Sequence, residues 1–120
     1  MNSLPSLKGV KDAATVIKDI VENTPFQLNQ RISNKLNCSV YLKREDLQRV
    51  RSFKIRGAYN KINSIVEDAR KRGVVCASAG NHAQGFALAC SSLKINGTVY
   101  MPTTTPKQKI NQVKTFGKDY

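Results

Sequence analysis

The first half of the chain shows two stretches of helical periodicity and one short strand pattern. Apolar residues recur every three or four positions over residues 7–21, which predicts an amphipathic helix that Asn23-Thr24-Pro25 ends. A second, shorter helix is predicted over residues 28–36 by the same spacing. Residues 39–43 are rich in β-branched and aromatic side chains and predict a strand, and the charged stretch 43–51 that follows predicts a loop.

The pattern becomes more regular after residue 51. Ser52 can cap a helix whose apolar face continues to Ala69 and which ends before Gly73. Residues 74–77 form a short apolar run typical of a buried strand, and small residues then lead into a helix with one apolar side over residues 83–93.

The last third repeats this order of elements. Asn96-Gly97 predicts a turn, and residues 98–101 read as the next strand. Thr105-Pro106-Lys107-Gln108 has the form of a capping box with proline at the first helical position, and the helix it opens is expected to end at Gly117. Alternating strands and helices predict parallel βαβ units, hence an α/β fold.

A parallel sheet of two strands is not a stable unit by itself. The pattern therefore predicts that these 120 residues are the amino-terminal part of a longer protein, or that they pair with another chain.

Composition limits the classes of function. The length suits one domain and not two complete ones. No apolar run reaches the ~20 residues of a membrane helix, and the first residues lack the pattern of a signal peptide, so a cytoplasmic protein without membrane partners is expected. The three cysteines lack C-x-x-C spacing and His82 stands alone, so no metal site is expected.

The chain is strongly basic, with 20 Lys and Arg against 8 Asp and Glu and a net charge of +12. Such a balance raises the question of nucleic acid. The longest basic run is only Arg70-Lys71-Arg72, and aromatic residues are not interleaved with basic ones as stacking platforms. Nucleic acid is therefore not an expected partner.

Lys54 is the first residue with a chemical implication. It lies in the predicted first turn of a helix, where the positive end of the helix dipole disfavours the protonated amine and so favours a nucleophile that can form a Schiff base. The residues by themselves leave open that Lys54 is one more surface lysine.

A second feature with a chemical implication is a run of small residues between the strand at 74–77 and the following helix. Residues 78–85 (SAGNHAQG) place backbone amides at a helix N-terminus, which suits a carboxylate or phosphate. The run matches neither dinucleotide nor P-loop motifs. The alternative is a tight turn in which Gly80 allows a positive φ, Asn81 caps the helix and Gly85 permits close helix–strand packing.

Together these segments resemble a family. The motif SFKIRGA at residues 52–58 and the loop SAGNHAQG at residues 78–85 are similar to those of the threonine dehydratases, pyridoxal 5'-phosphate enzymes of the tryptophan-synthase-β-like fold. The resemblance runs from about Thr24 to the end of the chain. It implies an amino-terminal part of such an enzyme, with residues 1–50 belonging to a large domain and residues 51–120 to the first part of a small cofactor and substrate-loop domain.

The resemblance also implies roles for individual residues. Lys54 would hold the cofactor through a Schiff base and remove the substrate's Cα proton, Phe53 would pack beside the cofactor, and Asn81 would hydrogen-bond its phenolic oxygen. The substrate carboxylate would be bound by the loop residues Ser78, Ala79, Gly80, Asn81 and His82.

The implied reaction is the dehydration and deamination of L-threonine, and of L-serine, to 2-oxobutanoate or pyruvate and ammonia, a lyase step in isoleucine biosynthesis. The resemblance implies a homo-oligomer for the complete enzyme. The family's phosphate-binding glycine loop and its contact to the pyridine nitrogen match no segment here, so these 120 residues alone are expected to be inactive.

Two other functions stay open. One is a serine dehydratase or serine racemase of the same fold. Serine racemases resemble this chain but carry serine at the position of Ala79, and a methyl group cannot donate the second proton that racemisation needs. The other is a non-catalytic basic interaction fragment that keeps the motifs.

Overall fold

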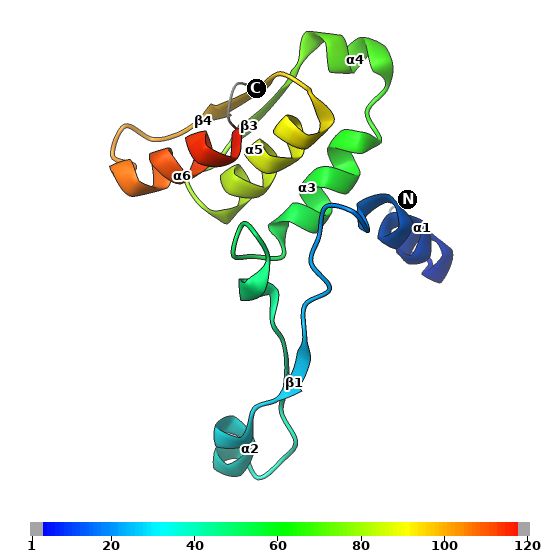
Figure 1. Cartoon of the computed structure of the whole chain (residues 1–120), viewed down its shortest axis with the longest axis vertical. Helices are drawn as coiled ribbons and strands as arrows, with labels where there is room; N and C mark the ends of the chain where they lie inside the picture. The colour runs from blue at the N-terminus through cyan, green and yellow to red at the C-terminus, as the bar shows by residue number, and fades with distance from the viewer. Residues whose placement is uncertain (1–3, 118–120) are drawn as a thin grey trace.

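The computed structural model describes residues 4–117, which form helices, two short sheets and one 3-10 helix (Figure 1). In chain order the elements are α1 (Leu7–Ile17), β1 (Phe26–Leu28), α2 (Gln30–Leu36), β2 (Tyr41–Lys43), the 3-10 helix η1 (Glu45–Leu47), α3 (Lys54–Asn63), α4 (Glu67–Arg72), β3 (Val74–Ala77), α5 (Asn81–Leu93), β4 (Gly97–Tyr100) and α6 (Lys107–Gly117).

The body of the molecule is built around one parallel βαβ unit. Strands β3 and β4 pair in parallel, from Val74 opposite Gly97 to Ala77 opposite Tyr100, and α5 connects them. Helices α3 and α6 pack against α5, so that helices cover the sheet from one side (Figure 1). The α/β fold with parallel βαβ organisation is confirmed.

The core lies between α3, α5 and the sheet. Its buried members include Val50, Ile55, Ala58, Ile62, Phe86, Leu88, Ala89, Cys90 and Ile95. Side chains alternate along the strands, so Val75 and Tyr100 on the opposite face of the sheet are 69% and 64% exposed. The apolar side of α6 packs on α5 and buries Val113, while Ile110 and Phe116 on the same helix are partly buried.

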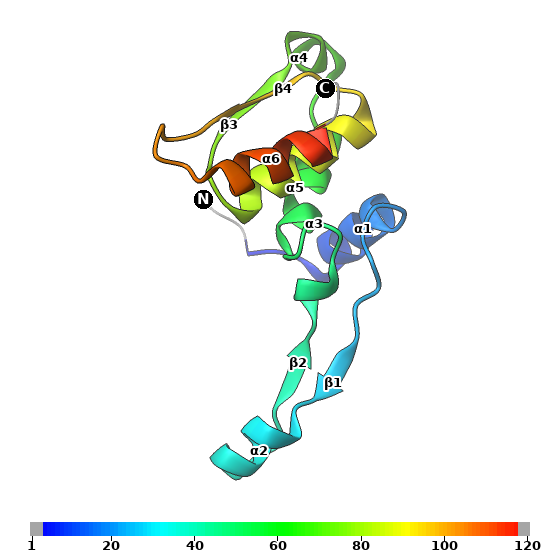
Figure 2. The same ribbon diagram turned by 60° about the vertical axis from the view of Figure 1, so that its left-hand side comes forward.

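A second, antiparallel sheet forms an arm that projects from the body (Figure 2). Strand β1 pairs with β2, with Phe26 opposite Lys43, and α2 connects the two strands along the chain. The rings of Phe26 and Tyr41 stack at 5.2 Å between centroids. The sequence pattern predicted β2 but assigned Leu28 to a helix. The helix begins only at Gln30, because Asn29 is its N-cap residue: the Asn29 side-chain oxygen accepts a hydrogen bond from the Ile32 amide.

The single helix expected from Ser52 to before Gly73 is wrong, because it divides into α3 and α4. The Ser64 hydroxyl donates to the Lys61 carbonyl as α3 ends, and Val66 is extended with ψ of 152°. The Arg70 guanidinium then donates to the carbonyls of Asn63 and Ile65 across the break. The carbonyls freed at the end of α3 are thereby satisfied.

Other helix boundaries also differ from the pattern. Helix α1 ends at Ile17 rather than near Val21. The Thr105 hydroxyl donates to the Pro102 carbonyl instead of forming the expected capping box, and α6 begins at Lys107. Of the described residues, none belongs to a helix with the length and apolar character required to traverse a bilayer.

Candidate active site

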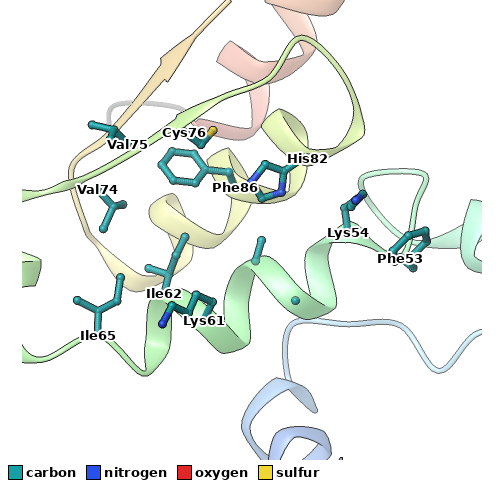
Figure 3. A pocket seen from close by; sticks show the side chains of 12 residues that line it. Phe53, Lys54, Lys61, Ile62, Ile65, Val74, Val75, Cys76, His82 and Phe86 are labelled. Atoms are coloured by element: carbon teal, nitrogen blue, oxygen red, sulfur yellow. The ribbon is translucent and has the colours of Figure 1, made fainter. Parts of the chain in front are cut away.

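Lys54 is the first residue of α3 and lines a cavity of about 520 Å³ between α3, β3 and α5 (Figure 3). Its place in the first helical turn is the one that the sequence predicted. The volume is within the range of small-molecule sites. The site therefore combines a primary amine with space for a ligand of cofactor size.

Phe53 and His82 share this cavity with Lys54. Figure 3 shows His82, from the first turn of α5, on the side of the cavity where Lys54 and Phe53 lie. The Lys54 Nζ lies 5.2 Å from the centroid of the Phe53 ring, so the amine and the aromatic ring form one unit at the mouth of the cavity. Phe53 is 59% exposed, which leaves most of its surface free to contact a ligand.

The far end of the cavity is apolar. Ile62 and Ile65 from the α3 side face Val74 and Phe86 across it (Figure 3). Cys76 also lines it, and burial raises the pKa of the Cys76 thiol. A protonated thiol is a poor nucleophile, so Lys54 has no strong competitor from Cys76.

Gly57 is a site residue that the sequence analysis missed. It lines the same cavity one helical turn after Lys54, and a Cβ added there would meet no heavy atom within 4 Å. Glycine in the middle of a helix is unfavourable, so its presence on the face of Lys54 was the available signal. Any side chain at this position would occupy open space at the lining of the cavity.

The predicted carboxylate loop is not all in this cavity. Ser78 and Ala79 line a separate cavity of about 370 Å³ at the carboxyl ends of β3 and β4, whereas His82 lines the cavity of Lys54. The Ser78 hydroxyl accepts the Gly80 amide at 3.3 Å. The loop thus lies beside the Lys54 cavity and contributes His82 to it.

Gly80 and Asn81 do not have the conformation and the capping role of the tight turn that the sequence offered as an alternative. Gly80 has φ of −130°, so it does not provide a positive φ, and it is Gly80 rather than Asn81 that precedes α5 as the cap residue. No side chain caps α5, which leaves the first amides of this helix available to a ligand or water. Asn81 is exposed and lines neither cavity.

Gly85 joins the two motifs directly. A Cβ on Gly85 would lie 3.0 Å from the Ile55 nitrogen and 3.1 Å from the Lys54 carbonyl carbon. Its role is therefore close packing of α5 on α3, and not the helix–strand contact that the sequence suggested. Helix α5 therefore packs against the backbone of Lys54 itself.

Across residues 4–117, His, Cys, Asp and Glu side chains nowhere gather in a group of three that could hold an ion. The groups that line the cavity are two amines, an imidazole, a thiol, two aromatic rings and several aliphatic side chains.

Comparison with known sequences gives consistent results. Residues 17–120 match the family described as pyridoxal-phosphate dependent enzyme. The chain is 59% identical over 108 residues to a biosynthetic L-threonine dehydratase of Halalkalibacterium halodurans and 53% identical over 119 residues to that of Bacillus subtilis. These alignments cover 90% and 99% of this chain but 26% and 28% of the relatives. The chain therefore spans about a quarter of the length of these curated relatives.

Solved structures show the same fold. The processed form of threonine deaminase isoform 2 from Solanum lycopersicum matches with a TM-score of 0.80 and 39% identity, over 99% of this chain and 34% of the other. A maize serine racemase matches with a TM-score of 0.89 and 30% identity, over 96% of this chain and 35% of the other. The backbone is thus slightly closer to the racemase, while sequence identity favours the deaminase.

Proposed function

The chain belongs to the family of pyridoxal-phosphate dependent enzymes, and on that basis we propose that it supplies the cofactor lysine and part of the substrate site for deamination of L-threonine. The observation that carries this proposal is Lys54, an amine at a helix start that lines a cavity of about 520 Å³. Identities of 53–59% to biosynthetic threonine dehydratases support the choice of substrate.

The residues at the cavity fit the cofactor. Lys54 offers the amine to which pyridoxal phosphate attaches, Phe53 offers an exposed aromatic face, and Gly57 leaves open space beside both. When bound, the cofactor supplies a ring that accepts the electron pair left on Cα after deprotonation.

Two parts of the chain would then act on the substrate. The amine of Lys54 would remove the Cα proton, because it is a base beside Phe53 at the end of the cavity that lies next to the start of α5. The uncapped amides at the start of α5, together with Ser78, Ala79, Gly80, Asn81 and His82, bind the substrate carboxylate. Holding the carboxylate orients the Cα–H bond toward the amine.

We expect the isolated 120 residues to be inactive. Among the described residues, the lining of the Lys54 cavity includes no glycine-rich loop that could surround a phosphate group. Activity therefore has to be measured on the complete polypeptide that carries this sequence.

The proposal is tested by assaying conversion of L-threonine to 2-oxobutanoate with the complete polypeptide. Lys54→Ala should lower kcat by about 10³-fold or more, because it removes both the attachment point and the base. Lys11→Ala, an exposed lysine on α1, is the matched control and should leave kcat unchanged. Full activity in Lys54→Ala would contradict the proposal.

Serine racemisation is the second candidate, favoured by the TM-score of 0.89 to the maize racemase. Ala79 argues against it, because a methyl group cannot donate a proton to the face of the substrate opposite Lys54. Chiral analysis of L-serine incubated with the complete polypeptide separates the two: we expect pyruvate with negligible D-serine. Formation of D-serine at a rate comparable to pyruvate would favour the racemase.

A further inference from the structure

The carboxylate of Glu45 joins three separate parts of the chain outside the cavity. It accepts two hydrogen bonds from Arg56, from Nε at 2.8 Å and from Nη2 at 2.7 Å, and a third from the Thr24 hydroxyl at 2.6 Å. The paired bonds give the fixed relative orientation typical of a bidentate arginine–carboxylate contact. Only 17% of the Glu45 side chain is exposed.

Gln48 holds the same region through a second set of hydrogen bonds. Gln48 is 2% exposed. Its side-chain nitrogen donates a hydrogen bond to the Glu22 carbonyl at 2.9 Å, and its side-chain oxygen accepts one from the Glu22 backbone amide at 2.9 Å. Glu45 and Gln48 therefore hold η1 and the loop after it against residues 22–24. Glu45 is thus a stationary anchor and not a mobile surface side chain.

Arg56, the partner of this anchor, lies in the first turn of α3. No side chain caps that helix at Phe53, and the Ser52 hydroxyl is 3.4 Å from the Lys54 amide, which is long for a hydrogen bond. The start of α3 is therefore set by tertiary contacts. Glu45 provides one of them.

The second contact is on another side of the same turn. Ile55 is 1% exposed in the core, and Gly85 brings α5 against the backbone at Lys54 and Ile55. Successive residues of a helix are separated by about 100°, so Lys54 and Arg56 project from nearly opposite sides with Ile55 between them. With Ile55 and Arg56 both fixed, only one direction remains for Lys54, and it leads into the cavity.

We propose that Glu45 is a positioning residue for Lys54, which acts through Arg56 to fix the rotation of the first turn of α3. The inference rests on the proposed function, because it matters only if Lys54 is the reactive lysine. Removing the carboxylate leaves Ile55 in the core but lets the turn rotate, which moves the amine relative to the cavity. A displacement of this kind costs far more in reaction rate than in stability.

The adjacent residue provides a matched control. Asp46 also lies in η1 and pairs with Arg44 at 2.7 Å, but this pair is more exposed, and its contacts do not include α3. Glu45→Gln and Asp46→Asn each remove one negative charge from the same 3-10 helix. Only the first weakens the contact to α3, because glutamine keeps one acceptor oxygen for Arg56 but loses the charge and the paired hydrogen bonds.

The experiment compares two lysines in one cavity. Lys61 also lies on α3 and lines the cavity, but two turns beyond Lys54. The complete polypeptide, stripped of cofactor, is treated with pyridoxal phosphate and borohydride well below its unfolding temperature, and the adducts on Lys54 and Lys61 are counted by peptide mapping. Because both lysines belong to one molecule, their adduct ratio responds to the position of Lys54 and not to the folded fraction.

We expect Glu45→Gln to lower the ratio of Lys54 to Lys61 adduct by about tenfold or more, as expected for a displaced reactive group. Asp46→Asn, and Val113→Ala as a destabilising variant in the remote core of α6, should leave the ratio within twofold of the unsubstituted protein. Exchanging the two partners in the double variant Glu45→Arg with Arg56→Glu should restore part of it.

An unchanged ratio in Glu45→Gln would overturn the positioning role. If that variant does not fold, Arg56→Lys takes its place, because lysine keeps the charge but loses the paired geometry. An unchanged adduct ratio in Arg56→Lys would overturn the positioning role in the same way. If the unsubstituted protein shows no preference for Lys54 over Lys61, the proposed function itself fails, and the positioning role fails with it.

Discussion

Gly57 and Lys54 lie one helical turn apart on α3 and line the same cavity. Glycine in a helix interior costs about 1 kcal/mol relative to alanine, and at Gly57 no neighbouring atom within 4 Å requires it. Space for a ligand is the reason that the structure offers for this glycine. A substitution here should therefore separate stability from ligand binding.

Gly57→Ala should raise the free energy of unfolding by up to about 1 kcal/mol and weaken the binding of pyridoxal phosphate, with a larger loss of binding in Gly57→Leu. Urea denaturation and a spectroscopic titration with the cofactor measure the two quantities. Gly9→Ala, in the exposed helix α1, serves as a control that should leave cofactor affinity unchanged. Equal or tighter cofactor binding in Gly57→Leu would show that the space has no such purpose.

Glu45 gives the molecule a pH dependence that can be assigned to one residue. The Arg56 guanidinium lowers the pKa of Glu45 from 4.5 to about 2, although burial opposes the shift. The ion pair therefore contributes fully to stability above about pH 4.5 and is lost as the pH falls toward 2, because the unfolded chain takes up its proton first.

Between pH 6 and pH 3, the complete polypeptide should lose about 1 kcal/mol more unfolding free energy than Glu45→Gln does, the upper range for a partly exposed ion pair. Urea denaturation at the two pH values measures the difference. Identical losses in both proteins would mean that Glu45 titrates normally.

Single residues were predicted best where a motif fixes the backbone. The first turn of α3 places Lys54 as expected, and Phe53 and His82 lie in its cavity. Ser78 and Ala79 belong to a neighbouring cavity, and no local pattern could show this separation, because it depends on the length of β3 and on the path of the loop. The roles given to these residues stay predictions.

Among the elements, the contact between α3 and α5 decides how the two motifs meet. A methyl group on Gly85 would press on backbone atoms of Ile55 and Lys54 at 3.0–3.1 Å, which cannot move as a flexible side chain can. The helices must separate to admit it. Such overpacking typically costs 1–3 kcal/mol.

Gly85→Ala should therefore destabilise the protein by about 1–3 kcal/mol, the opposite sign to Gly57→Ala, although both replace a helical glycine by a better helix former. Thermal unfolding of the two variants side by side tests the difference. If Gly85→Ala is as stable as the unsubstituted protein, the close approach of α5 to α3 is not a constraint.

Elements with a clear hydrophobic pattern were predicted, whereas strand β1 and the break between α3 and α4 were not. Helix α5 and strands β3 and β4 follow the expected order, because burial of a continuous apolar face leaves one arrangement. Strand β1 has three exposed residues and no alternation, so its pairing with β2 is visible only in three dimensions. The break between α3 and α4 depends on Arg70 reaching back to Asn63 and Ile65, which periodicity does not report.

At the scale of the whole molecule, the arm sets the dimensions. The radius of gyration is 16.8 Å, whereas a compact domain of 120 residues has about 13.6 Å. The arm of β1, α2 and β2 extends away from the body (Figure 2) and accounts for the difference. The division expected between residues 50 and 51 stays a prediction, although the body lies mainly in residues 51–117.

The whole fold brings two lysines to one cavity, and the proposed function requires that Lys54 and not Lys61 is the reactive one. Lys54 lies at the N-terminal end of α3 beside Phe53 and His82, while Lys61 lies in the last turn near the apolar end. Reactivity at Lys54 alone follows from its position next to the loop of α5. Reactivity at both lysines would follow from exposure alone.

The most direct measurement is borohydride reduction of the complete polypeptide with its cofactor bound at one equivalent, followed by peptide mapping. We predict a single adduct on Lys54, in the peptide that begins at Ser52. An adduct on Lys61 or on another lysine, or an even spread over several lysines, would contradict it.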